Sequence, residues 1–187
     1  MSGHVHVLAL VGSLRSGSHN RQLAEAAVKH APDGVEVTLY EGLAEVPFYN
    51  EDIDTDERRP AATRLRETAA RADAFLLVTP EYNGTMPAVL KNAIDWLSRP
   101  FGAGALAGTP TAVVGTAFGQ YGGVWAQDDA RKSAGIAGAT ILEDATLAIP
   151  GSVTRFAETH PADDTEAVAQ LRQVLSALAA AIEAPAS

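Results

Sequence analysis

Val7-Leu8-Ala9-Leu10-Val11-Gly12-Ser13-Leu14-Arg15-Ser16-Gly17-Ser18-His19-Asn20 is the stretch that decides the fold. Its apolar run predicts a buried strand, and its glycine- and serine-rich part predicts a loop that leads directly into a helix. A helix that begins in this way leaves backbone N–H groups unpaired and has a partial positive charge at its N-terminus. This arrangement commonly binds phosphate, because both the N–H groups and the helix dipole favour an anion.

The spacing of the glycines narrows the choice of phosphate ligand. Gly12 and Gly17 are separated as in a P-loop, but Ser18 stands where that motif has the lysine that contacts the β- and γ-phosphates. The loop also lacks the Gly-x-Gly-x-x-Gly pattern of dinucleotide-binding proteins. A hydroxyl-rich loop with one arginine, Arg15, suits a single terminal phosphate, as in a mononucleotide such as FMN. An ordinary strand-to-helix turn is the alternative, since serine and glycine are frequent in turns.

Length and composition indicate one domain spanning residues 1–187, with 47% hydrophobic and 20% charged residues. The chain has no cysteine, which excludes thiolate catalysis, so any redox chemistry needs a bound cofactor. The formal net charge of -9 argues against nucleic acid as a partner. No basic region precedes the first apolar run and no segment reaches membrane-spanning length. We therefore expect a cytoplasmic protein without a membrane partner.

Strand and helix patterns alternate along the chain. Asp73–Thr79 is the clearest buried strand, because Ala74-Phe75-Leu76-Leu77-Val78 is apolar on both faces, as a central parallel strand is. Asp163–Ile182 is the clearest helix, because its apolar residues recur at steps of three and four. Glu41–Arg59 is predicted to be a long acidic loop. The other expected strands are Val5–Val11, Val35–Tyr40, Thr111–Thr116 and Ile141–Ile149, and the other expected helices are Asn20–Ala31, Pro60–Arg71, Met86–Ser98 and Gly122–Ala137.

Five strands joined by helices predict an α/β, flavodoxin-like three-layer sandwich, in which a five-stranded parallel sheet has the order 2-1-3-4-5. In such sheets, ligands bind beyond the C-terminal ends of the strands, at the switch point between strands one and three. The serine-rich loop follows strand one, and Pro80-Glu81-Tyr82-Asn83-Gly84-Thr85-Met86-Pro87 follows strand three. Both unusual loops therefore fall where the topology places a ligand.

The loop after the third strand has the groups that a flat flavin ring needs. Pro80 fixes the chain as it leaves the strand, and Gly84 permits a left-handed backbone. Tyr82 can pack beside the ring, and Asn83 can hydrogen-bond its edge or brace the loop. Glu81 can instead hold backbone amides. The alternative is a turn that only starts the following helix.

The loop after the fourth strand, Gly115–Gly123, has four glycines in nine residues. Glycine at this density indicates either a close approach of the backbone to another group or local mobility. The loop could line the remaining edge of a flavin, or it could be a flexible linker. The residues alone do not separate these two interpretations.

Three groups of residues together resemble the NAD(P)H-dependent FMN reductases. They are the stretch from Gly12 to Asn20, the Pro80-Glu81-Tyr82-Asn83-Gly84 loop, and Leu90-Lys91-Asn92-Ala93-Ile94-Asp95-Trp96-Leu97-Ser98-Arg99. Val46-Pro47-Phe48-Tyr49-Asn50-Glu51-Asp52 is similar to that family's loop after strand two. The most similar branch includes bacterial chromate and quinone reductases and some azoreductases. The resemblance runs from the first strand to about Arg131, and the rest of the chain matches only in its pattern.

The resemblance implies a flavodoxin-like fold, bound FMN, and NADPH or NADH as the electron donor. Hydride would pass through FMN to a small acceptor, which could be a quinone, an azo compound, chromate or free flavin, in a ping-pong cycle without a catalytic side chain or a metal. It also implies a homodimer or homotetramer with the flavin near a subunit interface. The FMN-binding residues implied by position are Ser13, Arg15, Ser18 and Asn20 at the phosphate, Pro80, Glu81, Tyr82 and Asn83 at the isoalloxazine, and Thr116 near it.

Some features depart from the family or favour other functions. Trp125 stands where relatives often have an arginine that helps to join subunits, so the resemblance does not carry the tetramer contact over. An electron-transfer flavodoxin-type carrier also suits the negative charge, although flavodoxins usually have a threonine-rich phosphate loop. A non-redox binding or regulatory protein is possible on the same fold. His4 and His6 have no carboxylate partner in the local sequence, so we expect no metal there, and we expect Trp96 in the core or an interface.

Overall fold

The computed structural model describes residues 4–55 and 60–183. Five parallel strands form one sheet in the order β2-β1-β3-β4-β5, which confirms the predicted flavodoxin-like sandwich. β3 lies at the centre and all five of its residues are buried, as its apolar run predicts. The strands are β1 (Val5–Val11), β2 (Val35–Leu39), β3 (Ala74–Val78), β4 (Pro110–Thr116) and β5 (Thr140–Ile149).

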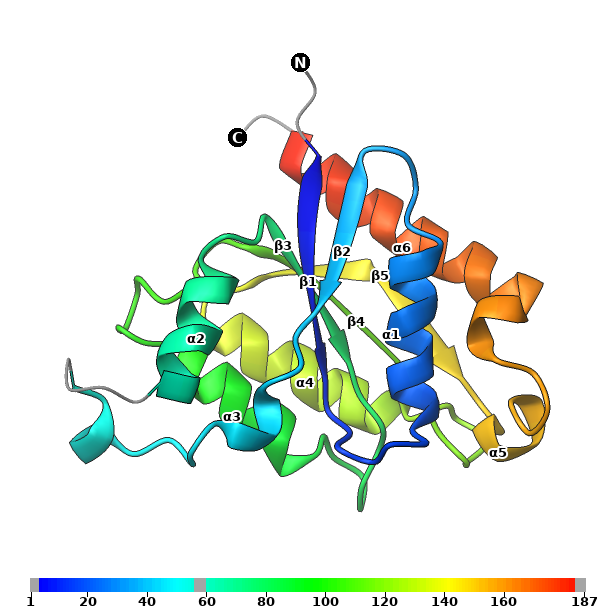
Figure 1. Cartoon of the computed structure of the whole chain (residues 1–187), viewed down its shortest axis with the longest axis horizontal. Coiled ribbons are helices and arrows are strands. Elements are labelled where there is room, and N and C mark those ends of the chain that lie inside the picture. The colour runs from blue at the N-terminus through cyan, green and yellow to red at the C-terminus, as the bar shows by residue number, and fades with distance from the viewer. Residues whose placement is uncertain (1–3, 56–59, 184–187) are drawn as a thin grey trace.

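Helices cover both faces of the sheet (Figure 1). One layer holds α1 (His19–Lys29) and α6 (Thr165–Glu183), and the other holds α2 (Pro60–Ala69), α3 (Ala88–Leu97) and α4 (Val124–Ile136). A short helix, α5 (Ser152–Arg155), follows β5 and was not predicted. No helix within residues 4–55 and 60–183 is long and apolar enough to cross a membrane.

Alternate residues of the inner strands face the two helical layers. In β1, Val7, Ala9 and Val11 belong to the core beneath α1 and α6. Leu8 and Leu10 belong to the core on the side of α2, α3 and α4. This alternation follows from the strand period of two residues, and it explains why β1 is apolar at every position from Val7 onward.

The last helix begins later than its apolar pattern predicts. We expected it to start at Asp163, but residues Pro161–Asp163 form a short 3-10 helix and α6 starts at Thr165. Asp164 is the reason, because its backbone is extended and its Oδ1 accepts the N–H of Ala167 at 2.9 Å. The Arg155 guanidinium also donates to this carboxylate, and these hydrogen bonds lower the pKa of Asp164 from 3.8 to about 2.

The predicted acidic loop is more ordered than its sequence suggests, although its residues 56–59 lie outside the described ranges. It contains two short 3-10 helices, Leu43–Glu45 and Glu51–Ile53. It is also fastened to α3, because Asn92 Oδ1 accepts the N–H of Tyr49 at 2.8 Å and Trp96 Nε1 donates to the Pro47 carbonyl at 2.7 Å. Trp96 is buried, as expected of a core residue.

The sheet register gives His6 a partner that was not expected. β1 and β2 pair His6 with Glu36, and His6 Nε2 lies 3.2 Å from the Glu36 carboxylate. Both side chains are largely exposed, so the contact is a surface ion pair of small energy when the histidine is charged. It lies near the N-terminal end of β1, at the opposite edge of the sheet from the three loops that follow β1, β3 and β4 (Figure 1).

Candidate functional site

The loop between β1 and α1 presents a row of backbone N–H groups. Within the described chain, the N–H groups of residues 13–17 donate no hydrogen bond to protein atoms, whereas that of Ser18 donates to the Arg15 carbonyl at 3.1 Å. Ser18 is the N-cap of α1, and its Oγ accepts the N–H of Arg21 at 3.3 Å. The hydroxyl proton of Ser18 stays free to be donated. Free N–H groups beside a helix N-terminus form a site for an anion.

Arg15 adds a positive charge to this loop. Its side chain is exposed, and in the part of the chain that the structure describes it makes no ion pair. The guanidinium bends back over the loop, so that a Cβ atom on Gly17 would lie 3.1 Å from Arg15 Nη1. Arg21, one turn into α1, is already paired with Glu25 and Glu41. In a chain of net charge -9, a guanidinium without a carboxylate suits an anionic ligand.

A hollow of about 330 Å³ lies between this loop and the end of β2. Ser13, Arg15 and Ser16 line it from the loop, and Tyr40 and Glu41 line it from the opposite side. Ser13 is largely buried, so its hydroxyl is held in place at the wall of the hollow. The loop therefore offers hydroxyl, N–H and guanidinium donors along one concave surface.

Asn20 and Thr116 join the first loop to the end of β4. Asn20 Nδ2 donates to the Thr116 carbonyl at 2.8 Å, and Asn20 Oδ1 accepts the Thr116 N–H at 2.9 Å. The Thr116 hydroxyl donates to the Ile149 carbonyl at 2.8 Å. Both side chains are buried. Their observed partners are protein groups, so their effect on a ligand is to position the loop; direct contact with a phosphate stays a prediction.

The loop after β3 is a tight hairpin. Tyr82 and Thr85 exchange both backbone hydrogen bonds, at 3.0 and 3.2 Å. Asn83 and Gly84 between them have φ values of 54° and 77°, as in a type I′ turn, for which Asn-Gly is favoured. Tyr82 is half exposed, and the Thr85 hydroxyl donates to Asp129 on α4. The hairpin thus has a fixed shape and presents its tyrosine at the rim.

Glu81 links this hairpin to α4. Its Oε2 accepts the N–H of Ala126 at 3.3 Å, in the first turn of the helix. The N-cap residue of α4 is Gly123, which has no side chain to fill this role. A carboxylate at a helix N-terminus is also stabilised by the helix dipole. Glu81 therefore holds a backbone amide, as one of its expected roles requires.

The glycine-rich loop after β4 is anchored rather than loose. The N–H of Ala117 donates to the Ile149 carbonyl at 3.1 Å, and the N–H of Ser152 donates to the Ala117 carbonyl at 3.0 Å. A Cβ atom on Gly115 would lie 2.1 Å from the Thr79 carbonyl oxygen, so glycine allows β4 to approach the end of β3. These contacts favour the close-approach interpretation over a flexible linker.

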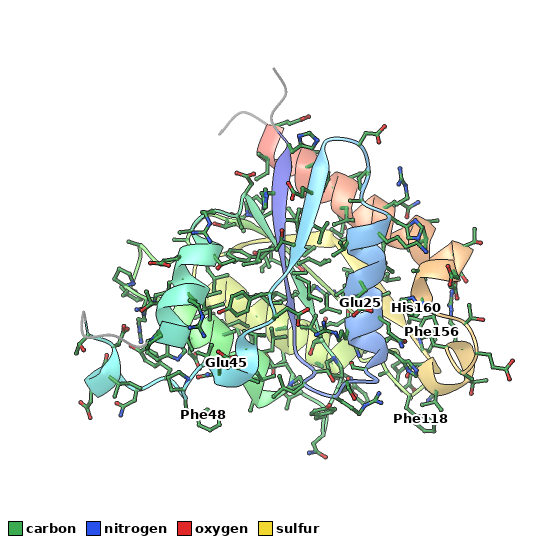
Figure 2. The ribbon with its side chains drawn as sticks, in the orientation of Figure 1. Glu25, Glu45, Phe48, Phe118, Phe156 and His160 are labelled. Carbon is green, nitrogen blue, oxygen red and sulfur yellow. The ribbon has the colours of Figure 1, made fainter. Side chains whose placement is uncertain are left out.

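Aromatic side chains stand at the rim of the three loops. Phe118 is 78% exposed, and Tyr121 and Trp125 form a tilted pair with ring centroids 5.6 Å apart. Phe48, which is also 78% exposed, lies at the other end of the same edge, as Figure 2 shows. Exposed aromatic groups provide surface for a flat ligand or a protein partner.

All nine predicted site residues lie at the edge formed by the C-terminal ends of the strands (Figure 1). Asn20 and Thr116 are in direct contact, and Ser18 begins the helix that carries Asn20. Sequence reasoning missed Asp129, which holds the hairpin through Thr85. The two residues are 44 positions apart and Asp129 belongs to no recognisable motif, so no local signal identifies it.

The chain is similar to known proteins of one family. The family model described as NADPH-dependent FMN reductase matches residues 5–154. A quinone reductase of Pseudomonas putida is 44% identical over 133 residues, which is 71% of each chain. A 2-hydroxy-1,4-benzoquinone reductase of a Burkholderia species is 42% identical over 125 residues, which is 67% of each chain. The solved structure of FerB, a flavoenzyme NAD(P)H:(acceptor) oxidoreductase from Paracoccus denitrificans, has a TM-score of 0.84 at 31% identity and covers 96% of this chain and 97% of its own.

Proposed function

The chain belongs to the NADPH-dependent FMN reductase family of oxidoreductases, and from this premise we propose that it binds FMN and passes electrons from NADPH or NADH to a small acceptor. The observation that carries the proposal is the row of N–H groups at residues 13–17, which are free of protein partners within the described ranges and lie beside Arg15 and the N-terminus of α1. This donor set matches the geometry and charge of a terminal phosphate.

At the phosphate, we assign direct contacts to the first loop. Ser13 and Ser18 donate hydroxyl hydrogen bonds, and Arg15 donates from its guanidinium. Asn20 and Thr116 hold this loop at the required distance from β4, because their polar groups are already bonded to the protein. In this assignment Asn20 is a positioning residue, and removing it would move the loop.

At the isoalloxazine, we assign contacts to the hairpin. Pro80 and the fixed Asn83 backbone place main-chain groups at the ring edge, and Tyr82 packs beside the ring through its exposed phenol. Glu81 acts through α4, whose first turn it caps. The Tyr82–Thr85 hydrogen bonds and the Thr85–Asp129 contact keep the hairpin in one shape, which favours binding because little ordering is needed.

When bound, FMN would supply the redox chemistry, which is to accept hydride from the nicotinamide and to pass electrons to the acceptor, and the protein contributes position and exclusion of water. The donor and acceptor use the same rim in turn, which is the basis for expecting a ping-pong cycle. Tyr82 serves there as a packing group, and we assign no side chain as a general acid or base. Quinones are the acceptors that the relatives' names favour, ahead of azo compounds, chromate and free flavin.

We also propose that the protein works as a homodimer or homotetramer. The exposed aromatic residues at the rim support a covered surface there, and Trp125, which is among them, stands where the resemblance implies an arginine that joins subunits. Sedimentation equilibrium of the FMN-saturated protein, with Trp125→Arg alongside, tests this proposal. A monomer at all concentrations would contradict it.

The function is tested by the visible spectrum of FMN-saturated protein under anaerobic conditions, followed after addition of NADPH and, separately, NADH. Rapid bleaching of the bound flavin band is the expected result, and reoxidation by a quinone should restore it. Initial rates at varied donor and acceptor concentrations should give the parallel reciprocal lines of a ping-pong cycle. A bound flavin that neither nucleotide reduces would indicate an electron carrier, and no flavin binding would leave a non-redox protein.

A further inference from the structure

His19 occupies a position at the phosphate loop that the assignment above does not use. It directly follows the N-cap Ser18 and is therefore the first residue of α1. Its imidazole is partly buried, and within residues 4–55 and 60–183 it makes no side-chain hydrogen bond with the protein. The ring is nevertheless held in place, because it packs edge-on against Phe156 with centroids 5.7 Å apart.

The support behind His19 is itself rigid. Phe156 is buried and directly follows α5. Figure 2 shows it in the segment that lies beside α1. The Arg155 guanidinium lies 5.8 Å from the centre of the Phe156 ring. It is bound to Asp164 at 2.7 Å and Glu166 at 3.0 Å, so its charge is largely balanced. His19 is thus fixed at the N-terminus of α1 by packing rather than by a counter-ion.

The charged groups that surround His19 are cationic or already paired. The first loop contributes Arg15, and the α5 segment contributes Arg155 behind Phe156. On α1 itself the next turn brings uncharged Gln22 and Leu23, and the Glu25 carboxylate lies further along, 3.6 Å from His160 Nε2. Burial lowers the pKa of His19, and the Arg15 guanidinium lowers it further. Both effects favour the neutral imidazole in the ligand-free protein.

We propose that His19 is a second cationic contact of the FMN phosphate beside Arg15, and that it takes up a proton as the phosphate binds. The inference rests on the proposed function, because it needs a phosphate at the N-terminus of α1. A phosphate dianion placed there reverses the sign of the potential that Arg15 imposes on the ring. The negative phosphate then stabilises the protonated imidazole, which raises the pKa of His19 in the complex above its pKa in the free protein.

The linkage has a definite sign. Because the complex binds the proton more tightly than the free protein does, FMN affinity is highest below the pKa of the free imidazole and falls as pH rises through the pKa of the complex. A difference of about one pKa unit corresponds to about a tenfold difference in affinity between the two limits. The FMN phosphate also titrates, with a second pKa of about 6 for a phosphomonoester. The histidine contribution is therefore measured as a difference from a variant that cannot titrate.

The experiment measures the FMN dissociation constant of the full chain at pH 6.5 and pH 8.0 by quenching of flavin fluorescence. His19→Phe keeps an aromatic ring against Phe156 and removes the titration. His4→Gln, at the opposite edge of the sheet, is the matched control. From pH 6.5 to pH 8.0, we expect the FMN dissociation constant of wild type and of His4→Gln to rise about threefold more than that of His19→Phe. Calorimetry in two buffers of different ionisation enthalpy should show proton uptake that His19→Phe lacks.

Riboflavin separates the phosphate effect from the ring. It has no phosphate, so its affinity should depend on pH equally in wild type and His19→Phe. Identical FMN pH profiles and identical proton uptake in the two proteins would overturn the inference and leave the proposed function standing. Absence of FMN binding to wild type at every pH would instead overturn the proposed function. If His19→Phe does not fold, the imidazole is titrated by NMR in wild type loaded with FMN and with riboflavin, and equal pKa values would overturn the inference.

Discussion

Asn20 and Thr116, which are 96 positions apart, form two hydrogen bonds in opposite directions. The amide nitrogen of Asn20 donates to the Thr116 carbonyl at 2.8 Å, and its amide oxygen accepts the Thr116 N–H at 2.9 Å. Both residues are buried, so neither backbone group has water as a substitute partner. This pair fixes the distance between the loop after β1 and the end of β4, and hence the width of the site.

Asn20→Asp should destabilise the fold at pH 7. The variant keeps an acceptor for the Thr116 N–H, but it loses the donor and places a negative charge against the Thr116 carbonyl. We expect a loss of about 2–3 kcal/mol in the free energy of unfolding, measured with urea on flavin-free protein. Gln22→Glu adds a charge to the same helix away from Thr116 and should change stability by less than about 0.5 kcal/mol. Unchanged stability with weaker FMN binding would instead make Asn20 a direct phosphate contact.

Glu81→Ala should loosen the start of α4. The variant removes the acceptor of the Ala126 N–H, and we expect a loss of about 1 kcal/mol, the usual effect of deleting a helix cap. Glu81→Gln keeps an oxygen acceptor and should lose less. Thermal unfolding gives the stability, and hydrogen exchange of the Ala126 amide reports the local opening. Glu67→Ala, on an exposed face of α2, is the control, and equal exchange in all four proteins would mean that the cap does not form.

Most of the fold could be predicted because its signals are local. The run from Ala74 to Val78 is apolar on both faces, and only a central strand buries it fully. The loops after β1 and β3 can be recognised by their glycine, serine and proline residues. A parallel sheet of this order then places both loops at the same edge. The motifs in these loops also predicted the family, which the match over residues 5–154 confirms.

The contacts that complete the site could not be predicted, because they join residues far apart in sequence. Asn20 was assigned to the phosphate from its place in a motif, and nothing local shows that Thr116 occupies both of its polar groups. The glycine-rich loop had two interpretations for the same reason. The role of Gly115 depends on the Thr79 carbonyl oxygen, which lies just after the neighbouring strand β3.

Asp164→Asn should remove a pH-dependent part of the stability. The hydrogen bonds from Arg155 lower the pKa of Asp164 to about 2 from 3.8 in the unfolded chain, so the folded state favours the charged form. This contribution is fully present above about pH 4 and is lost as pH falls toward about 2. We expect it to be about 1–2 kcal/mol, since the carboxylate is mostly buried. Urea midpoints of wild type between pH 2 and pH 5 should fall more steeply than those of the variant.

Asp163→Asn is the control for that measurement. Asp163 is adjacent in sequence, but its contact with Lys29 is largely exposed and spans 3.4 Å. A surface pair of this kind contributes little, so the Asp163→Asn profile should follow that of wild type. If the Asp164→Asn profile also followed that of wild type, the acid sensitivity would come from other carboxylates.

Arg15→Ala should weaken FMN binding while leaving the fold intact. Within the described ranges Arg15 has no ion-pair partner, so its removal costs the protein no internal contact, and the free energy of unfolding should change by less than about 0.5 kcal/mol. A hydrogen bond to a charged group contributes about 1.5–3 kcal/mol, so the FMN dissociation constant should rise by roughly 10- to 150-fold. Arg15→Lys keeps the charge without the guanidinium fork, so its FMN dissociation constant should lie between those of wild type and Arg15→Ala.

The control is Arg71→Ala, which removes an exposed arginine just after α2 and should bind FMN as wild type does. Riboflavin affinity should stay constant in all four proteins, because Arg15 is assigned to the phosphate alone. An unchanged FMN affinity in Arg15→Ala would show that the phosphate lies elsewhere, and a parallel loss of riboflavin affinity would show that the arginine contacts the ring.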